Sequence, residues 1–333
     1  MKETLTFTTG CAINADMYYL ACSPDQHRTT DDVPHSVMCF YQHQTNDKWF
    51  YHEIPGCLVT SVAFVDPAPG AVREVFALSE QGEIERYSRL GSQMESISGA
   101  GLRGEDGSLG YLSRLKSVDG VLYACGFNGQ VYRRTIQGWV HADAGLIQRG
   151  LDPAALILND PVALLEQLSA SAQSSRDLMD IHGSSQADLY VVGGDGFIAH
   201  FNGVRWQILA QQTAASLNAV FVRSADEVWI AGNRGTLLKG SATSGFTVLT
   251  RKGLPVDFHA IAPLGEDIYI GASDGLYTFR NNKLQKVRIA VVEDLSEVSS
   301  VEFKDGMLWV LSSKKLLRFD GVQWDVFEHP NNH

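Results

Sequence analysis

A chain of 333 residues with 44% hydrophobic and 20% charged residues has the composition of a globular protein. Its formal net charge of −11 argues against a nucleic acid or an anionic membrane as partner, because both require Lys and Arg to neutralise phosphate. No stretch reaches the roughly 18 apolar residues of a transmembrane helix, and the first residues lack the apolar core of a signal peptide. We therefore expect a cytoplasmic protein, and its charge permits a basic protein partner.

An aromatic residue within an apolar run recurs along the chain, with a small residue three positions later and usually a glycine six positions later. Successive aromatic anchors are separated by 57, 47, 67, 39, 40 and 40 residues. A period near 40 with several short strands per unit is typical of a β-propeller. We predict an all-β fold, one domain over residues 1–333 that forms a ring of seven four-stranded antiparallel blades. The anchors are Tyr19, Phe76, Tyr123, Tyr190, Trp229, Tyr269 and Trp309.

We name the strands of each blade A to D from the channel outwards, so that B–C and D–A connections emerge on one face of the disk. Residues 5–8 are expected to form strand A of the first blade, because the last unit already has four strands; the alternative is an outer strand of the last blade, so the sequence leaves open how the ring closes. The B–C loop of that blade, residues 23–34, carries Asp25, Asp31 and Asp32. Its spacing matches no specific metal site, so we predict a solvated acidic loop and neither a metal nor a cofactor.

Two long D–A connections emerge on the same face. Residues 98–110 carry Arg103, Glu105 and Asp106. Residues 143–175 contain two Asp-Pro pairs that begin apolar segments, which predicts a short helical insertion between blades 3 and 4. This insertion carries Asp152, Leu156, Asp160 and Glu166. Its apolar residues either cover the disk or remain exposed for a partner.

The B–C turn tips lie on this face as well. Asn128, Asp195, Arg234 and Asp274 stand five positions after their anchors, as do Gln81 and Lys314. The turn itself explains each residue singly, because such turns favour residues that tolerate positive φ. As a set they could form a polar ring. Since loops carry function on rigid scaffolds, we predict that this face, with the residues named here and in its three long loops, binds a protein partner.

Polar residues also occur on the innermost strands. His182 and His259 lie on two of them, and Asp180 and Glu302 occupy similar positions. An enzyme could use such groups as acid and base at the channel mouth. The simpler interpretation is a wet channel lined by polar side chains. The five cysteines lack C-x-x-C spacing, which favours reduced thiols over a disulfide framework.

The segments DLYVVGGDGFIAHFNGVRWQIL (188–209) and DEVWIAGNRGTLLKG (226–240) resemble the repeats of bacterial WD40-like or YVTN-like propellers, including the photosystem-assembly-factor type. The resemblance implies the fold and carries over no catalytic residue. Free-standing propellers of this kind also resemble some immunity proteins that neutralise secreted bacterial toxins. We therefore predict a non-enzymatic, immunity-type inhibitor of a basic toxin or effector, for which a nuclease is one candidate. An assembly factor or adaptor, and a hydrolase or lyase at the channel mouth, are the alternatives.

Overall fold

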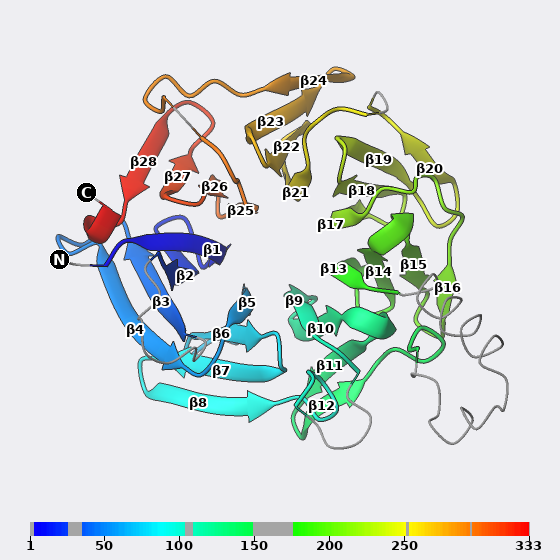
Figure 1. Ribbon diagram of the computed structural model, residues 1–333, viewed down its shortest axis with the longest axis horizontal. Coiled ribbons are helices and arrows are strands. Elements are labelled where there is room, and N and C mark those ends of the chain that lie inside the picture. Colours follow the sequence, from blue (N-terminus) through cyan, green and yellow to red (C-terminus); the bar gives the residue numbers. More distant parts are fainter. Residues whose placement is uncertain are drawn as a thin grey trace, which may run out of the picture.

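Seven four-stranded sheets are arranged in a ring around a central axis (Figure 1). The computed structural model describes residues 3–25, 35–103, 109–148, 176–250, 253–293 and 295–332. Each sheet holds four strands that are consecutive in sequence, and every neighbouring pair within a sheet is antiparallel. The predicted ring of seven four-stranded blades is confirmed. Within the described residues the only helices are three 3-10 turns, and the helices predicted within 152–168 lie outside them.

The strands of the first four blades have the following bounds. Blade 1 contains β1 (Leu5–Ala12), β2 (Met17–Pro24), β3 (His35–Gln42) and β4 (Trp49–Pro55). Blade 2 contains β5 (Val59–Phe64), β6 (Glu74–Ser79), β7 (Glu83–Ser88) and β8 (Gly91–Ser96). Blade 3 contains β9 (Leu112–Val118), β10 (Val121–Gly126), β11 (Val131–Thr135) and β12 (Gly138–His141), with η1 (Phe127–Gly129) in its B–C turn. Blade 4 contains β13 (Leu178–Ser185), β14 (Asp188–Gly193), β15 (Ile198–Phe201) and β16 (Trp206–Ile208), with η2 (Gly194–Gly196) in its B–C turn.

The anchors of the last three blades follow one another at a constant spacing of 40 residues. Blade 5 contains β17 (Leu217–Ser224), β18 (Glu227–Gly232), β19 (Thr236–Ser241) and β20 (Gly245–Val248). Blade 6 contains β21 (Phe258–Leu264), β22 (Asp267–Ala272), β23 (Gly275–Arg280) and β24 (Lys283–Lys286). Blade 7 contains β25 (Ser300–Lys304), β26 (Met307–Leu311), β27 (Lys315–Phe319) and β28 (Trp324–Glu328), followed by η3 (Pro330–Asn332).

The seven aromatic anchors all lie on B strands and are buried. B strands such as β14 and β18 are buried along nearly their whole length, because blades cover both of their faces. The core is therefore divided into clusters between neighbouring blades. One of these clusters joins the first and last blades through Tyr18, Tyr41 and Trp309. All five cysteines are free and buried, as predicted.

The ring closes without a strand exchanged between its ends. Residues 5–8 belong to β1, the innermost strand of blade 1, which confirms the expectation for this segment. The Phe7 amide donates a hydrogen bond to the Ser313 carbonyl at 2.8 Å. In η3, the Asn332 side chain accepts a bond from the Leu5 amide at 2.9 Å and donates one to the Leu5 carbonyl at 3.0 Å. One backbone bond and the bonds of the Asn332 side chain therefore join the two ends of the ring.

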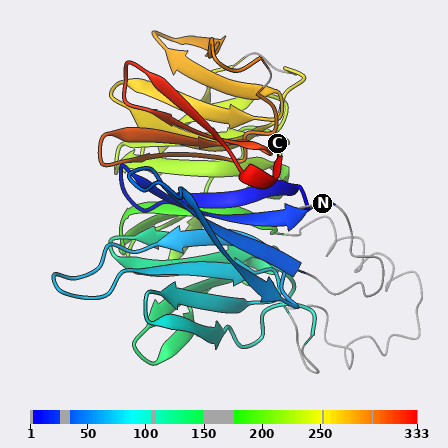
Figure 2. The same cartoon turned by 90° about the vertical axis from the view of Figure 1, so that its left-hand side faces the viewer.

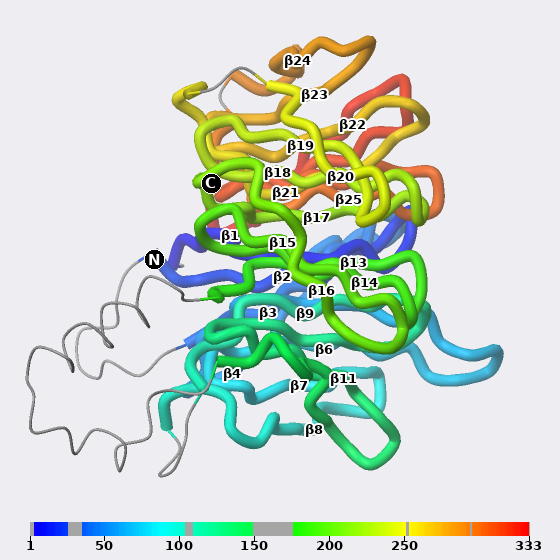
Figure 3. The backbone as a smooth tube through the Cα atoms, turned by 90° about the vertical axis from the view of Figure 1, so that its right-hand side faces the viewer, coloured from blue at the N-terminus to red at the C-terminus, as the bar shows by residue number. Residues whose placement is uncertain are grey.

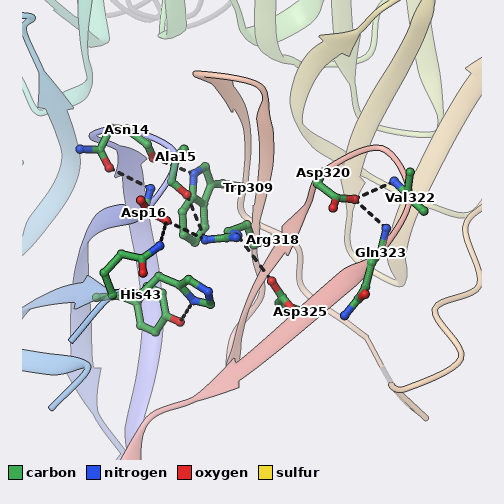
Figure 4. A network of polar contacts seen from close by, with 12 residues as sticks. Asn14, Ala15, Asp16, His43, Trp309, Arg318, Asp320, Val322, Gln323 and Asp325 are labelled. Carbon is green, nitrogen blue, oxygen red and sulfur yellow. Dashed lines mark hydrogen bonds and ion pairs between the residues drawn. The ribbon is translucent and has the colours of Figure 1, made fainter. Parts of the chain in front are cut away.

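A second contact between blades 1 and 7 lies at the other end of the strands (Figure 4). Arg318 forms ion pairs with Asp16 at 3.0 Å and Asp325 at 3.5 Å, so it connects the A–B turn of blade 1 to β28. The Trp309 indole donates to the Asn14 carbonyl at 3.1 Å. Both ends of the junction are therefore tied by polar side chains over a buried aromatic cluster.

The disk has two distinct faces (Figures 2 and 3). We call the face of the B–C and D–A connections, where both chain termini lie, the upper face. The lower face carries the A–B and C–D turns. The A–B connection of blade 2, residues 65–73, projects from the lower face and is an insertion that sequence analysis did not identify. None of the described helices is long and apolar enough to span a membrane.

Candidate functional site

The central channel holds a cavity of about 440 Å³. The A strands of all seven blades contribute to it, and its polar lining includes Arg114, Lys116, Asp180, His182, His259 and Glu302. The predicted channel position of the two histidines and the two acids is confirmed. The question is whether these groups converge on a reaction centre.

Most of them instead bind the neighbouring blade. The inner edge of an A strand has unpaired backbone groups, and in several blades a polar side chain from the preceding blade satisfies some of them. Asp180 accepts a hydrogen bond from the Val220 amide at 2.9 Å, and Glu302 accepts one from the Ala12 amide at 2.7 Å. Ser61 accepts from the Leu115 amide at 3.0 Å.

His182 has the same structural role. Its Nδ1 accepts a hydrogen bond from the Val222 amide at 3.1 Å, which places the ring proton of the neutral form on Nε2. Burial, assisted by the positive charge of Lys116, lowers the pKa of His182 to about 4. The ring is therefore neutral at pH 7, and the nitrogen that a general base would use is already occupied.

The two channel carboxylates are also engaged. Asp180 forms an ion pair with Arg114 at 3.3 Å, and the arginine also donates to the Met179 carbonyl at 3.4 Å. Burial raises the pKa of Glu302, while the charge of Lys116 opposes this shift. His259 Nε2 is buried without a hydrogen-bond partner in the described part of the chain. Among the described residues that line the channel, no nucleophile, base and orienting group form a connected set. No three His, Cys, Asp or Glu side chains among the described residues are grouped so that they could hold a metal ion.

The predicted residues of the upper face serve partly as supports. The B–C turns hold the D–A connections beside them: the Asn128 side chain donates to the Leu109 carbonyl at 2.9 Å, and the Arg234 amide donates to Asp257 at 2.8 Å. Asn128, Asp195 and Arg234 have positive φ, as expected for these turns. The side chains of Asp195 and Arg234 are exposed and form no hydrogen bond or ion pair within the described residues.

Other predicted residues of this face have intramolecular partners. Asp25 pairs with Lys314. Although partial burial raises the pKa of Asp25, hydrogen bonds from Lys314 and Thr6 outweigh this effect and lower the pKa to about 2. Arg103 pairs with Glu83 at 3.1 Å, and Asp274 accepts a bond from Tyr277 at 2.9 Å and pairs with Lys286 at 3.0 Å. Asp31, Asp32, Glu105, Asp106, Asp152, Leu156, Asp160 and Glu166 lie outside the described residues.

Sequence analysis missed the interblade role of the channel residues, although the repeat contains a signal for it. Asp180 bonds to residue 220 and His182 to residue 222, and both separations equal 40, the spacing of the last three anchors. Asn218 likewise bonds to the Phe258 carbonyl, 40 positions ahead. A polar residue on an A strand therefore reaches the equivalent strand of the next repeat.

Comparison with known proteins supports the fold and gives one functional indication. No protein-family model matches the chain. The chain is 27% identical over 218 residues to the immune protein Tsi7 of Pseudomonas aeruginosa, a match that covers 66% of this chain and 64% of that relative. The aligned part thus spans less than two thirds of the relative's length.

The similar solved structures are propellers. The WD40 propeller domain of Doa1 has a TM-score of 0.63 at 12% identity and covers 100% of this chain and 96% of its own. YCF48 bound to D1 peptide has a TM-score of 0.62 at 12% identity and covers 96% of this chain and 93% of its own. At these identities the likeness concerns the fold, and it confirms the WD40-like propeller architecture.

Proposed function

We propose that this protein is a non-enzymatic, immunity-type inhibitor that binds a bacterial toxin or effector protein. The observation that carries the proposal is the similarity to an immune protein over two thirds of the chain. The channel is consistent with it, since the described acids and His182 are engaged in bonds between blades. Propellers are scaffolds for many functions, so the fold by itself does not select this one.

We further propose that the partner is basic and that inhibition takes place in the cytoplasm. A net charge of −11 attracts and steers a cationic protein over long range. A nuclease is one candidate, because its nucleic-acid site must be basic and an acidic inhibitor complements such a site. The upper face, with exposed Asp195 and Arg234, is a proposed contact surface.

The direct test is protection of cells. We propose that the gene beside that of this protein in its source genome encodes the effector. That gene is expressed from an inducible promoter, with and without this chain. We expect growth to stop with the effector alone and to be restored when both are present. Purified effector should also form a stable complex with the chain. Growth arrest that this chain does not relieve would contradict the proposal.

A second candidate is an assembly factor that binds a segment of another protein. It is favoured by the structural neighbour described as bound to a peptide, which shares 12% identity with this chain. The two candidates differ in outcome. If this chain is an assembly factor, it would leave the growth arrest unchanged. Deleting its gene would instead lower the cellular amount of the protein complex that it helps to assemble.

A further inference from the structure

The lower face exposes aliphatic side chains at the tips of its C–D turns. All seven C–D turns belong to the described residues, and four of them carry a large, strongly exposed aliphatic residue. Single exposed apolar residues are ordinary on a protein surface, but a recurrence at equivalent places in a repeat is a pattern. These residues are Leu90, Ile136, Val204 and Val322, with exposed fractions of 79%, 103%, 85% and 90%.

Hydrogen bonds fix the turns that present these side chains. Asp320 accepts bonds from the amides of Val322 and Gln323, both at 2.7 Å (Figure 4). Asn202 accepts a bond from the Val204 amide at 3.1 Å, and Ser88 accepts one from the Leu90 amide at 3.1 Å. Turns that are already ordered lose little conformational entropy when a partner covers them. The apolar tips are therefore preorganised for contact.

Inside this ring of tips, the A–B turns carry acids. Six of the seven blades place one there: Asp16, Asp66, Asp119, Asp226, Glu266 and Asp305. Three of the six form ion pairs: Asp16 with Arg318, Asp66 with Lys304, and Glu266 with Arg223. Asp119, Asp226 and Asp305 are exposed and have no ion pair within the described residues. Asp119 and Asp305 have positive φ, and both Asp and Asn tolerate this conformation. Asn would therefore suit these turns without adding negative charge.

The acids surround a hollow at the centre of the face. The channel cavity opens among Asp66, Asp119 and Phe303, and Phe303 is 44% exposed. The mouth is also lined by Lys116 and by Lys304, which pairs with Asp66, and exposed Arg73 lies in the A–B connection of blade 2. The acidic centre of the lower face is therefore the unpaired set Asp119, Asp226 and Asp305, and the aliphatic tips form its rim. A second copy of this chain docked face to face does not fit it, because two acidic centres would repel each other. A nucleic acid is excluded on the same ground.

We propose that the lower face is a docking surface for a folded protein domain that places a basic patch over the channel mouth and apolar side chains against the C–D turns. This inference rests on the proposed function, because it names a surface through which the toxin or effector is held. Attraction to the acidic centre accelerates encounter, and the covered aliphatic tips slow dissociation.

The test measures affinity for the effector encoded beside this gene, purified in a catalytically inactive form. The triple variant Asp119→Asn, Asp226→Asn and Asp305→Asn removes three charges while keeping residues that tolerate the turns. We expect binding about tenfold weaker, with a reduced dependence on salt concentration. The same substitution at positive φ on the upper face, Asp195→Asn, tests the other proposed contact surface separately.

The apolar rim is tested by the double variant Ile136→Ser and Val322→Ser. We expect dissociation to be several-fold faster, because contact area that excludes water is lost. Val291→Ser is the control, since Val291 is 69% exposed and lies in the D–A connection of the upper face. Circular dichroism and thermal unfolding of each variant exclude loss of folding.

The outcomes separate the two proposals. If wild-type chain binds the effector and both lower-face variants bind with unchanged affinity, the docking surface is wrong and the proposed function stands. If wild-type chain does not bind the effector, the proposed function fails and the inference fails with it. Weaker binding by the lower-face variants supports the inference whether or not Asp195→Asn also weakens binding.

Discussion

Polar side chains of the inner strands hold neighbouring blades together. Asp180 shows the principle: its carboxylate accepts the Val220 amide of the next blade and pairs with Arg114 of the preceding one. A channel-facing acid therefore connects three blades. Its burial makes the arrangement sensitive, because loss of Asp180 leaves the partly buried charge of Arg114 unpaired and the buried Val220 amide unsatisfied.

Asp180→Ala should consequently lower the free energy of unfolding by about 3 kcal/mol. Urea denaturation followed by tryptophan fluorescence measures the change. Asp226→Asn, at an exposed A–B turn, is the control and should change stability by less than about 0.5 kcal/mol. Equal, small effects of both substitutions would show that the Asp180 bonds are unimportant for stability.

His182 predicts a dependence of stability on pH. Its pKa is about 4 in the folded protein, against about 6.5 in an unfolded chain. Between these values the unfolded chain binds a proton that the folded protein does not, so the free energy of unfolding falls as pH drops from 6.5 to 4. His182→Asn keeps an acceptor for the Val222 amide and removes the titration. We expect this variant to lose less stability than the wild type between pH 7 and 4.5, and equal losses would contradict this role.

At the scale of elements, the aromatic anchors and glycine turns were enough to predict all seven blades and the order of strands within them. This succeeded because blades 2 to 6 repeat one local pattern: an apolar B strand followed by a residue with positive φ at the B–C turn. The functional surface was harder to predict. Loop length directed attention to the upper face, whereas the exposed tips of the lower face occur in short turns such as Asp320 to Gln323, whose length is unremarkable.

The B–C turns also hold the connections between blades, which gives a test at this scale. Gly196 has φ of 70°, and a Cβ there would collide with the Thr213 carbonyl oxygen in the D–A connection of the same blade. Gly196→Ala should therefore lower the free energy of unfolding by more than about 2 kcal/mol, from backbone strain and collision together. Gly306→Ala is the control, because its φ of 83° brings strain but its Cβ would meet open space. Thermal unfolding that ranks Gly306→Ala as the more harmful change would contradict the steric argument.

At the scale of the whole molecule, the ring is a rigid support with two differently built faces. The junction between its first and last blades is tied at both ends by side chains, with Asn332 on one side and Arg318 on the other. Sequence analysis left the closure open, because the bonds join residues about 300 positions apart and no local pattern reports them. A closed disk of this kind can present turns from several blades to one partner at once.

The central claim is that this protein neutralises a toxic effector by binding it. The most direct measurement is growth of cells that express the effector encoded beside its gene, with this chain supplied as wild type or as the lower-face triple variant. The account predicts full protection by the wild type and protection by the variant only at a higher expression level. Growth arrest that persists at every level of wild-type chain would contradict it.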